Sequence, residues 1–174
     1  VVEEPAKNGT IKLNVSTLPL QKGKSTTCVV LKKVTPAGNR IQSAVSSNSK
    51  VAAVKLSAGK LKITGKKAGT AYITVTGSEG GTAKVKVKVQ NKKVATKSLS
   101  LSRKKLVLKR GKKYTLKVVR NPLTATDKLS FRSSNKKVVS VNAKGVVTAK
   151  KKGTVKLTVK AASGKKIVCT IRVK

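Results

Sequence analysis

Lysine is the residue type that this chain carries in sufficient number and density to do chemistry. The sequence contains 42 Lys and Arg residues against 4 Asp and Glu, which gives a formal net charge of +38. Because so few lysines can pair with acids inside the fold, the surface must attract polyanions. The densest runs predict an anion-contact surface made of Lys84, Lys86, Lys88, Lys104, Lys105, Lys109, Arg110, Lys112, Lys113, Lys136, Lys137, Lys150, Lys151 and Lys152.

Two interpretations of these lysines stay open. In the first, they form a solvated outer face and blunt exposed edge strands. In the second, they contact an anionic polymer such as a wall teichoic acid, a sulfated or sialylated host glycan, or an anionic lipid surface. Specific nucleic-acid binding is not expected, because the only aromatic residues are Phe131, Tyr72 and Tyr114 and because Lys lacks the bidentate geometry of Arg.

The same sequence offers little for catalysis or metal binding. It contains no His, and its four acids are Glu3, Glu4, Glu79 and Asp127, so we expect neither an imidazole base nor a pair of catalytic carboxylates. Residue counts allow a Ser–Lys dyad, but solvated surface side chains are the simpler interpretation. We therefore predict that the chain is not an enzyme and that it holds no metal and no cofactor.

An internal repeat distributes these residues over two similar modules. Residues 18–24 align with 106–112, residues 46–51 with 133–138, and residues 67–70 with 151–154. Cys28 and Cys169 fall at non-equivalent places in the two copies, which argues against a disulfide and favours two small core residues. The repeat predicts two domains, residues 1–91 and 92–174.

Within each copy the apolar residues recur at every second position. Residues 83–89 and 155–160 alternate between an apolar residue and Lys or Thr, which is typical of a strand with one face in solvent. Gly, Pro, Asn and Ser separate the short segments, and no helical stripe occurs. The pattern predicts an all-β fold of two tandem immunoglobulin-like β-sandwich domains with antiparallel sheets. Strands are expected near residues 10–15, 24–33, 40–47, 51–56, 60–65, 70–77 and 82–90, and near 97–102, 112–120, 128–134, 137–141, 145–150, 154–161 and 166–173.

Several short motifs recur in the same order in both copies. An apolar triplet precedes Gly-Lys, a Pro follows the second strand, and then come Ser-Ser-Asn, a short Val-rich strand, Gly-Thr and a final alternating strand. Taken together, this order resembles the bacterial Ig-like domain, group 2, over nearly the whole chain. The family usually places Trp before the Ser-Asn turn, where this chain has Phe131 in the second copy and Ala44 in the first. The loss of a large aromatic residue predicts looser packing in the first copy.

The resemblance implies modules of bacterial surface proteins, such as intimin-like and invasin-like adhesins, or accessory modules beside extracellular enzymes. We therefore expect a non-catalytic, extracellular or cell-surface role in adhesion, spacing, display or wall association, with a Lys-rich surface that contacts anionic cell-wall or host glycan polymers. The alternative is an accessory carbohydrate- or polyanion-binding module of a larger extracellular enzyme. We expect a monomer joined to neighbouring domains of a longer chain. No transmembrane segment is expected, because no run of about 18 apolar residues occurs.

Overall fold

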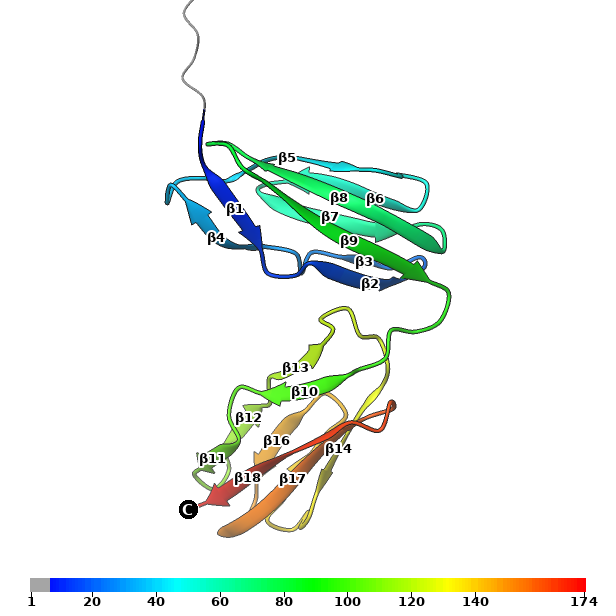
Figure 1. Cartoon of the computed structure of the whole chain (residues 1–174). Helices are drawn as coiled ribbons and strands as arrows, with labels where there is room; N and C mark the ends of the chain where they lie inside the picture. Colours follow the sequence, from blue (N-terminus) through cyan, green and yellow to red (C-terminus); the bar gives the residue numbers. More distant parts are fainter. Residues whose placement is uncertain (1–6) are drawn as a thin grey trace, which may run out of the picture. The chain divides into compact units, whose positions relative to one another are not determined.

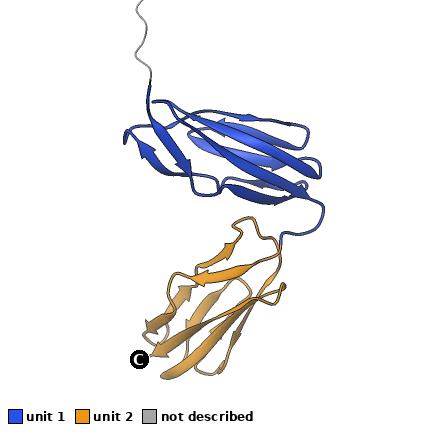
Figure 2. Ribbon diagram, in the orientation of Figure 1, with its two compact units in different colours: residues 1–94 blue, residues 95–174 orange. Residues whose placement is uncertain are grey.

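The computed structural model describes residues 7–174, so Glu3 and Glu4 lie outside the described residues. The chain divides into two compact units, Val1–Val94 and Ala95–Lys174 (Figure 2). Every regular element among residues 7–174 is a strand (Figure 1). The prediction of an all-β chain with two Ig-like β-sandwich domains is confirmed. Within this range no helix is long and apolar enough to cross a membrane.

In the first unit, three sheets enclose one core. Strands β2, β9, β8 and β5 form a four-stranded sheet in that order, β3, β7 and β6 form a three-stranded sheet, and β1 pairs with β4. The strands are β1 (Thr10–Leu13), β2 (Thr17–Gln21), β3 (Ser25–Thr26), β4 (Leu31–Thr35), β5 (Ile41–Ser46), β6 (Ala52–Ser57), β7 (Lys60–Gly65), β8 (Gly69–Gly77) and β9 (Thr82–Gln90).

The second unit repeats this topology strand for strand. Its four-stranded sheet has the order β11-β18-β17-β14, its three-stranded sheet the order β12-β16-β15, and β10 pairs with β13. The strands are β10 (Ser98–Leu101), β11 (Lys105–Leu108), β12 (Lys113–Thr115), β13 (Val118–Asn121), β14 (Leu129–Ser133), β15 (Val139–Val141), β16 (Val146–Ala149), β17 (Gly153–Ala161) and β18 (Lys166–Val173).

The two-residue period of the sequence builds each core. In β17, Val155, Leu157 and Val159 are buried while the residues between them face outward. In β18, Cys169 and Ile171 complete the same layer. Burying one such aliphatic side chain stabilises the fold by roughly 1.5–3 kcal/mol. The outward positions of Lys156 and Lys160 on β17 therefore follow from the burial of the residues on either side of each.

Two strands of the structure were not predicted from the sequence. β2 and β11 pair in parallel with β9 and β18, the last strands of their units, so the prediction of purely antiparallel sheets is wrong. β2 contains Pro19, which has no N–H for a ladder hydrogen bond and obscures the strand pattern. The strand is tolerated because it lies at the edge of its sheet, where one side of the backbone needs no partner strand.

The second predicted strand of each copy is divided in the structure. In place of residues 24–33 the first unit has β3, which pairs with β7, and β4, which pairs with β1. The second unit divides residues 112–120 in the same way, into β12 and β13. The chain leaves one sheet and joins another between the two halves, and this change of pairing partner leaves no mark in a local apolar pattern.

Candidate anion-binding surface

The lysine row predicted on the first unit lies on the outer face of β9. Lys84, Lys86 and Lys88 are exposed and alternate with buried valines. Across the sheet they lie opposite Thr74, Tyr72 and Thr70 of β8, in that order. The three cations therefore form a single file on one strand, beside a strand that carries no charge at these positions.

Most of the other predicted clusters gather at one end of the second unit. The turn after β11 is held against β16 by hydrogen bonds from the Gly111 N–H to the Ala149 carbonyl (2.8 Å) and from the Ala149 N–H to the Lys112 carbonyl (3.0 Å). The Lys150 N–H donates to the Val138 carbonyl (2.8 Å), which joins the loop before β17 to the turn after β14. We name the exposed cations of these three loops the basic end: Lys109, Arg110, Lys112, Lys136, Lys137, Lys150, Lys151 and Lys152.

The structure separates the remaining predicted residues from this end. Lys105 lies on the outer face of the four-stranded sheet, opposite Thr170 of β18. Lys104 precedes β11, and its carbonyl accepts a hydrogen bond from the Thr170 N–H (2.8 Å). Lys113 begins β12 in the three-stranded sheet. The run that looked continuous in the sequence thus belongs to three different surfaces.

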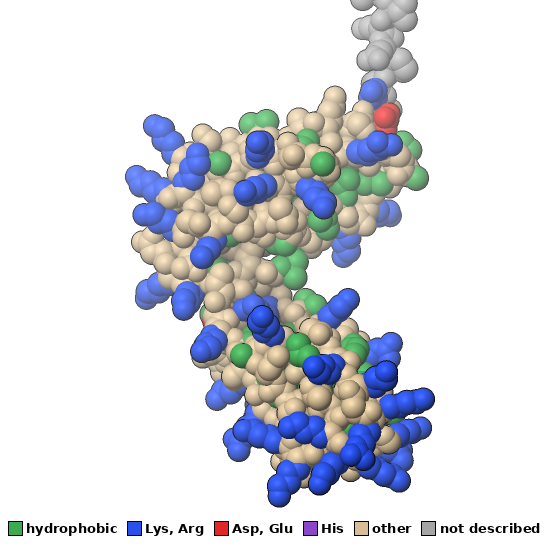
Figure 3. Space-filling view, turned by 180° about the vertical axis from the view of Figure 1, so that it is seen from behind, with side chains coloured by type: hydrophobic (Ala, Val, Ile, Leu, Met, Phe, Trp, Pro, Cys, Tyr) green, Lys and Arg blue, Asp and Glu red, His purple; other side chains and the backbone are tan. Residues whose placement is uncertain are grey.

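A second set of cations, of which only Lys105 was predicted, escaped the sequence analysis because its members are scattered along the chain. Strand alternation brings them together on the outer face of the four-stranded sheet of the second unit. We name this set the basic face: Lys105, Arg132, Lys156, Lys160, Lys166 and Arg172. Seen from behind in Figure 3, this unit shows many Lys and Arg side chains and no acidic side chain on the visible side. The alternation of residues 155–160 already contained Lys156 and Lys160, whereas only the pairing of β14 with β17 places Arg132 beside them.

A shallow hollow of about 490 Å³ lies on the basic face between β14 and β17. It is lined by Ser130, Arg132, Ser134, Lys156, Thr158 and Lys160. A second hollow of about 760 Å³ borders β14 and β15 and shares Ser130, Arg132 and Ser134 with the first. The Arg132 side chain is therefore common to both, and we call the first one the β14–β17 hollow.

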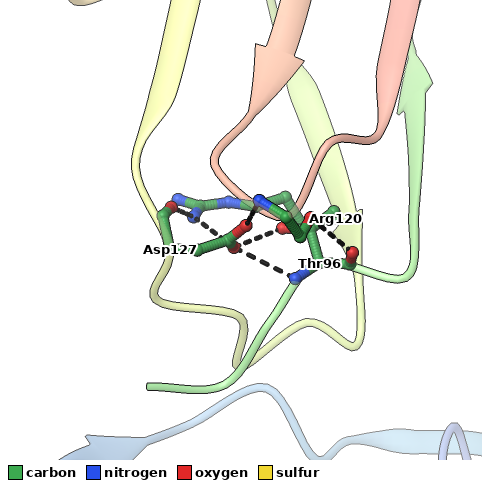
Figure 4. A network of polar contacts seen from close by, with 4 residues as sticks. Thr96, Arg120 and Asp127 are labelled. Atoms are coloured by element: carbon green, nitrogen blue, oxygen red, sulfur yellow. Dashed lines mark hydrogen bonds and ion pairs between the residues drawn. The ribbon is translucent and has the colours of Figure 1, made fainter. Parts of the chain in front are cut away.

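Asp127 is the one acid of the second unit, and it is buried. Its Oδ1 accepts hydrogen bonds from the Thr96 N–H (3.1 Å) and hydroxyl (2.5 Å), and its Oδ2 accepts one from the Ser163 N–H (3.1 Å) (Figure 4). Arg120 Nη1 donates to the Asp127 carbonyl (2.7 Å) and lies 4.0 Å from Oδ1. Burial raises the pKa of Asp127, but the hydrogen bonds from Thr96 and Ser163 outweigh it and hold the pKa below its usual value.

This carboxylate does not neutralise the basic end. Ser163, which donates a hydrogen bond to Asp127, lies two residues after the end of β17, whereas Lys150–Lys152 lie directly before its first residue. A strand of this length spans about 30 Å at roughly 3.3 Å per residue. That distance exceeds the Debye length of about 8 Å at physiological salt. Among residues 7–174, no three His, Cys, Asp or Glu side chains group as metal ligands would.

The repeated sandwich with its outward lysines places the chain in the Ig-like β-sandwich class. Residues 9–89 and residues 95–171 each match the bacterial Ig-like domain (group 2). The chain therefore belongs to the group 2 bacterial Ig-like family, whose domains are non-catalytic. The resemblance carried by the sequence motifs is confirmed.

One curated relative and two solved structures describe what the chain is similar to. It is 45% identical over 75 residues to a kappa-carrageenase of Pseudoalteromonas carrageenovora, a match that covers 42% of this chain and 19% of the enzyme. The chain thus spans about a fifth of the curated relative. Domains 5–6 of the S-layer protein SbsC are 19% identical (TM-score 0.47; 95% of this chain, 97% of that chain). SbsC domains 4–9 are 20% identical (TM-score 0.48; 95% of this chain, 31% of that chain).

Proposed function

We propose that this pair of domains is a non-catalytic part of an extracellular or surface-bound bacterial protein, and that it holds its chain against an anionic polymer. The proposed role is adhesion, spacing or wall association. The observation that carries it is the crowding of the basic face and the basic end on a unit whose one acid, Asp127, is buried at the opposite end. Membership of a family of non-catalytic Ig-like domains supports the same role.

The physical basis of such a contact is electrostatic. Like charges held on one rigid face repel one another, and a polyanion lying on that face relieves the repulsion while it releases its own condensed counterions. Because flat sheets and loop ends present the charges without a deep pocket, we expect many weak contacts along a polymer. Affinity should therefore depend steeply on salt and on polymer charge density.

A second candidate is an accessory module of a larger extracellular enzyme. It is favoured by the 45% identity over 75 residues to a kappa-carrageenase, of which the match covers only 19%. In this candidate the domains keep a catalytic domain close to its polysaccharide. Both candidates require the same contact with an anionic polymer, and the neighbouring sequence in the full-length chain distinguishes them.

The test is binding of the 174-residue chain to polysaccharides of different charge. We expect retention on heparin and kappa-carrageenan, no retention on neutral dextran, and a fall in affinity of more than tenfold between about 50 mM and 200 mM salt. Replacing Lys150, Lys151 and Lys152 by Glu should weaken the retention. Equal retention on dextran, or affinity that does not change with salt, would refute the proposal.

A further inference from the structure

The β14–β17 hollow is a part of the basic face in which cations from two neighbouring strands line one depression. Lys156 and Lys160 project from β17, and Arg132 projects from β14. In the strand register Arg132 lies opposite Thr158, midway between the two lysines. With about 3.4 Å per residue along a strand and about 4.8 Å between strands, the two lysines are roughly 14 Å apart at their Cα atoms, with Arg132 roughly 8 Å from each.

Side-chain hydrogen bonds fix this arrangement. The Ser134 hydroxyl oxygen accepts from the Lys156 N–H (3.0 Å), and the Ser130 hydroxyl donates to the Lys160 carbonyl (3.2 Å). These bonds flank the Arg132–Thr158 pair and hold β14 against β17 at both lysine positions. The Ser134 hydroxyl still has its own hydrogen to donate, since it acts as an acceptor in this contact. The hollow thus combines three cations with a hydroxyl donor on a rigid sheet.

The first unit lacks this arrangement at the same place in the fold. The repeat aligns Val45 with Arg132, Tyr72 with Lys156, and Thr76 with Lys160, in strands β5 and β8 that pair as β14 and β17 do. Val45 and Tyr72 are exposed there, at 65% and 46%. The general lysine excess of the chain therefore does not account for the hollow, because the equivalent surface of the sister domain carries no cation at any of the three positions.

The charges of the hollow have no counter-ion within the described residues of the fold. Lys160 also lies directly opposite Lys166 of β18, and like charges in such a cross-strand pair destabilise a sheet. A bound anion would lower this repulsion. The Arg132 side chain makes no hydrogen bond or ion pair within residues 7–174 and is exposed, which leaves its guanidinium fork turned to solvent for a ligand.

We infer that the β14–β17 hollow is a binding subsite for a sulfate ester carried on a polysaccharide. The inference rests on the proposed function and names the group and the residues that give it specificity. Arg132 donates two parallel N–H bonds to two sulfate oxygens, and Lys156 or Lys160 reaches a third oxygen from one side. A sulfate ester offers three acceptor oxygens and stays charged at all ordinary pH values, whereas a carboxylate offers two. The other lysine contacts the next anionic group along the polymer.

Two variants with the same loss of charge test the inference. In the hollow variant, Arg132, Lys156 and Lys160 are each replaced by Gln. In the control, Lys150, Lys151 and Lys152 of the basic end are each replaced by Gln. We expect the hollow variant to lose about tenfold or more in affinity for kappa-carrageenan, since charge-assisted hydrogen bonds are lost, and the control to lose about two- to threefold through the general field.

Two further measurements make the result specific. Replacing both Lys156 and Lys160 by Gln removes the donors to the third sulfate oxygen, so it should weaken binding to kappa-carrageenan several-fold more than binding to alginate, whose carboxylates offer only the two oxygens that Arg132 takes. A gain-of-binding variant, Val45→Arg with Tyr72→Lys and Thr76→Lys, should raise affinity for the sulfated polymer by building the same triad on the first unit. Thermal melts of each variant report whether it is folded.

The outcomes separate the subsite from the general function. Equal losses in the hollow variant and the control, with salt-dependent binding by the unaltered chain, would overturn the subsite and leave polyanion contact intact. Equal losses on both polymers by the variant that lacks Lys156 and Lys160 would overturn the choice of sulfate. Absence of salt-dependent binding by the unaltered chain would overturn the proposed function together with the subsite.

Discussion

The carboxylate of Asp127 accepts a hydrogen bond from the backbone N–H of Ser163 at 3.1 Å and so joins the start of β14 to the β17–β18 hairpin. In the first unit, Asn39 Oδ1 accepts from the Glu79 N–H at 3.0 Å and holds the β8–β9 hairpin in the same manner. One side-chain oxygen thus clamps the last hairpin of each domain. The accepting group is a charged carboxylate in the second unit and a neutral amide in the first. The contact in the second unit is therefore sensitive to pH.

Replacing Asp127 by Asn should destabilise the second unit at neutral pH and flatten its acid unfolding. The loss expected from hydrogen bonds to a charged, buried group is about 1–3 kcal/mol. Because the folded-state pKa of Asp127 lies below the unfolded value of about 3.9, its stabilisation is complete above that value and is lost as the pH falls through the folded-state pKa. Urea unfolding of both proteins at neutral pH and across the acid range measures the difference. If the free energy of unfolding changed with pH in the same way in both proteins, Asp127 would not be the source of the pH dependence.

The strand alternation, more than the lysine clusters, held the predictive information for the candidate site. It placed Lys84, Lys86 and Lys88 correctly on the outside of β9, because one strand is enough to fix one face. Arg132 could not be joined to Lys156 in the same way, since their proximity depends on the register between β14 and β17. The local runs of lysine, by contrast, predicted each loop of the basic end separately. They could not show that backbone hydrogen bonds bring these loops together.

Gly145→Ala should cost more stability than Gly111→Ala, although both glycines have nearly the same backbone conformation. Their φ angles are +78° and +80°, so each substitution should pay a similar strain of about 1 kcal/mol. A Cβ at Gly145 would also lie 3.1 Å from the Phe131 ring, whereas a Cβ at Gly111 would meet nothing within 4 Å. Thermal unfolding of the two variants compares them within one domain. Equal losses of stability in the two variants would show that the Phe131 ring can move away from the new Cβ without destabilising the domain.

Lys160→Thr should stabilise the second unit by about 0.2–1 kcal/mol at low salt, because it removes the like-charge pair with Lys166. The gain should shrink as salt is raised, since screening weakens repulsion between exposed charges. Lys165→Thr is the matched control, because Lys165 lies in the hairpin loop before β18. Chemical unfolding at low and high salt measures both. If Lys165→Thr stabilised the unit as much as Lys160→Thr, the gain in stability would come from the lower net charge and not from removal of the Lys160–Lys166 pair.

Cys169 should resist alkylation in the folded protein while Cys28 reacts. Cys169 is fully buried, and burial raises its pKa, which suppresses the reactive thiolate. Cys28 is half-buried, and both thiols are free. Mass spectrometry after mild treatment with iodoacetamide should find the label on Cys28, and on Cys169 only when urea is added. Early labelling of Cys169 would indicate that the second core opens locally.

The final prediction concerns where the chain can be divided. Each unit has its own apolar core, so fragments cut between Val94 and Ala95 should each unfold cooperatively. A cut after residue 91, at the boundary predicted from the sequence, should give a less stable first fragment. The reason is that the Gln90 side chain donates hydrogen bonds to the Lys92 and Lys93 carbonyls (3.2 and 3.1 Å), and the shorter fragment lacks both acceptors. The difference should be at most about 1 kcal/mol, because these bonds are exposed. Urea unfolding of both fragments measures it, and a first fragment without a cooperative transition at either cut would contradict the independence of the two domains.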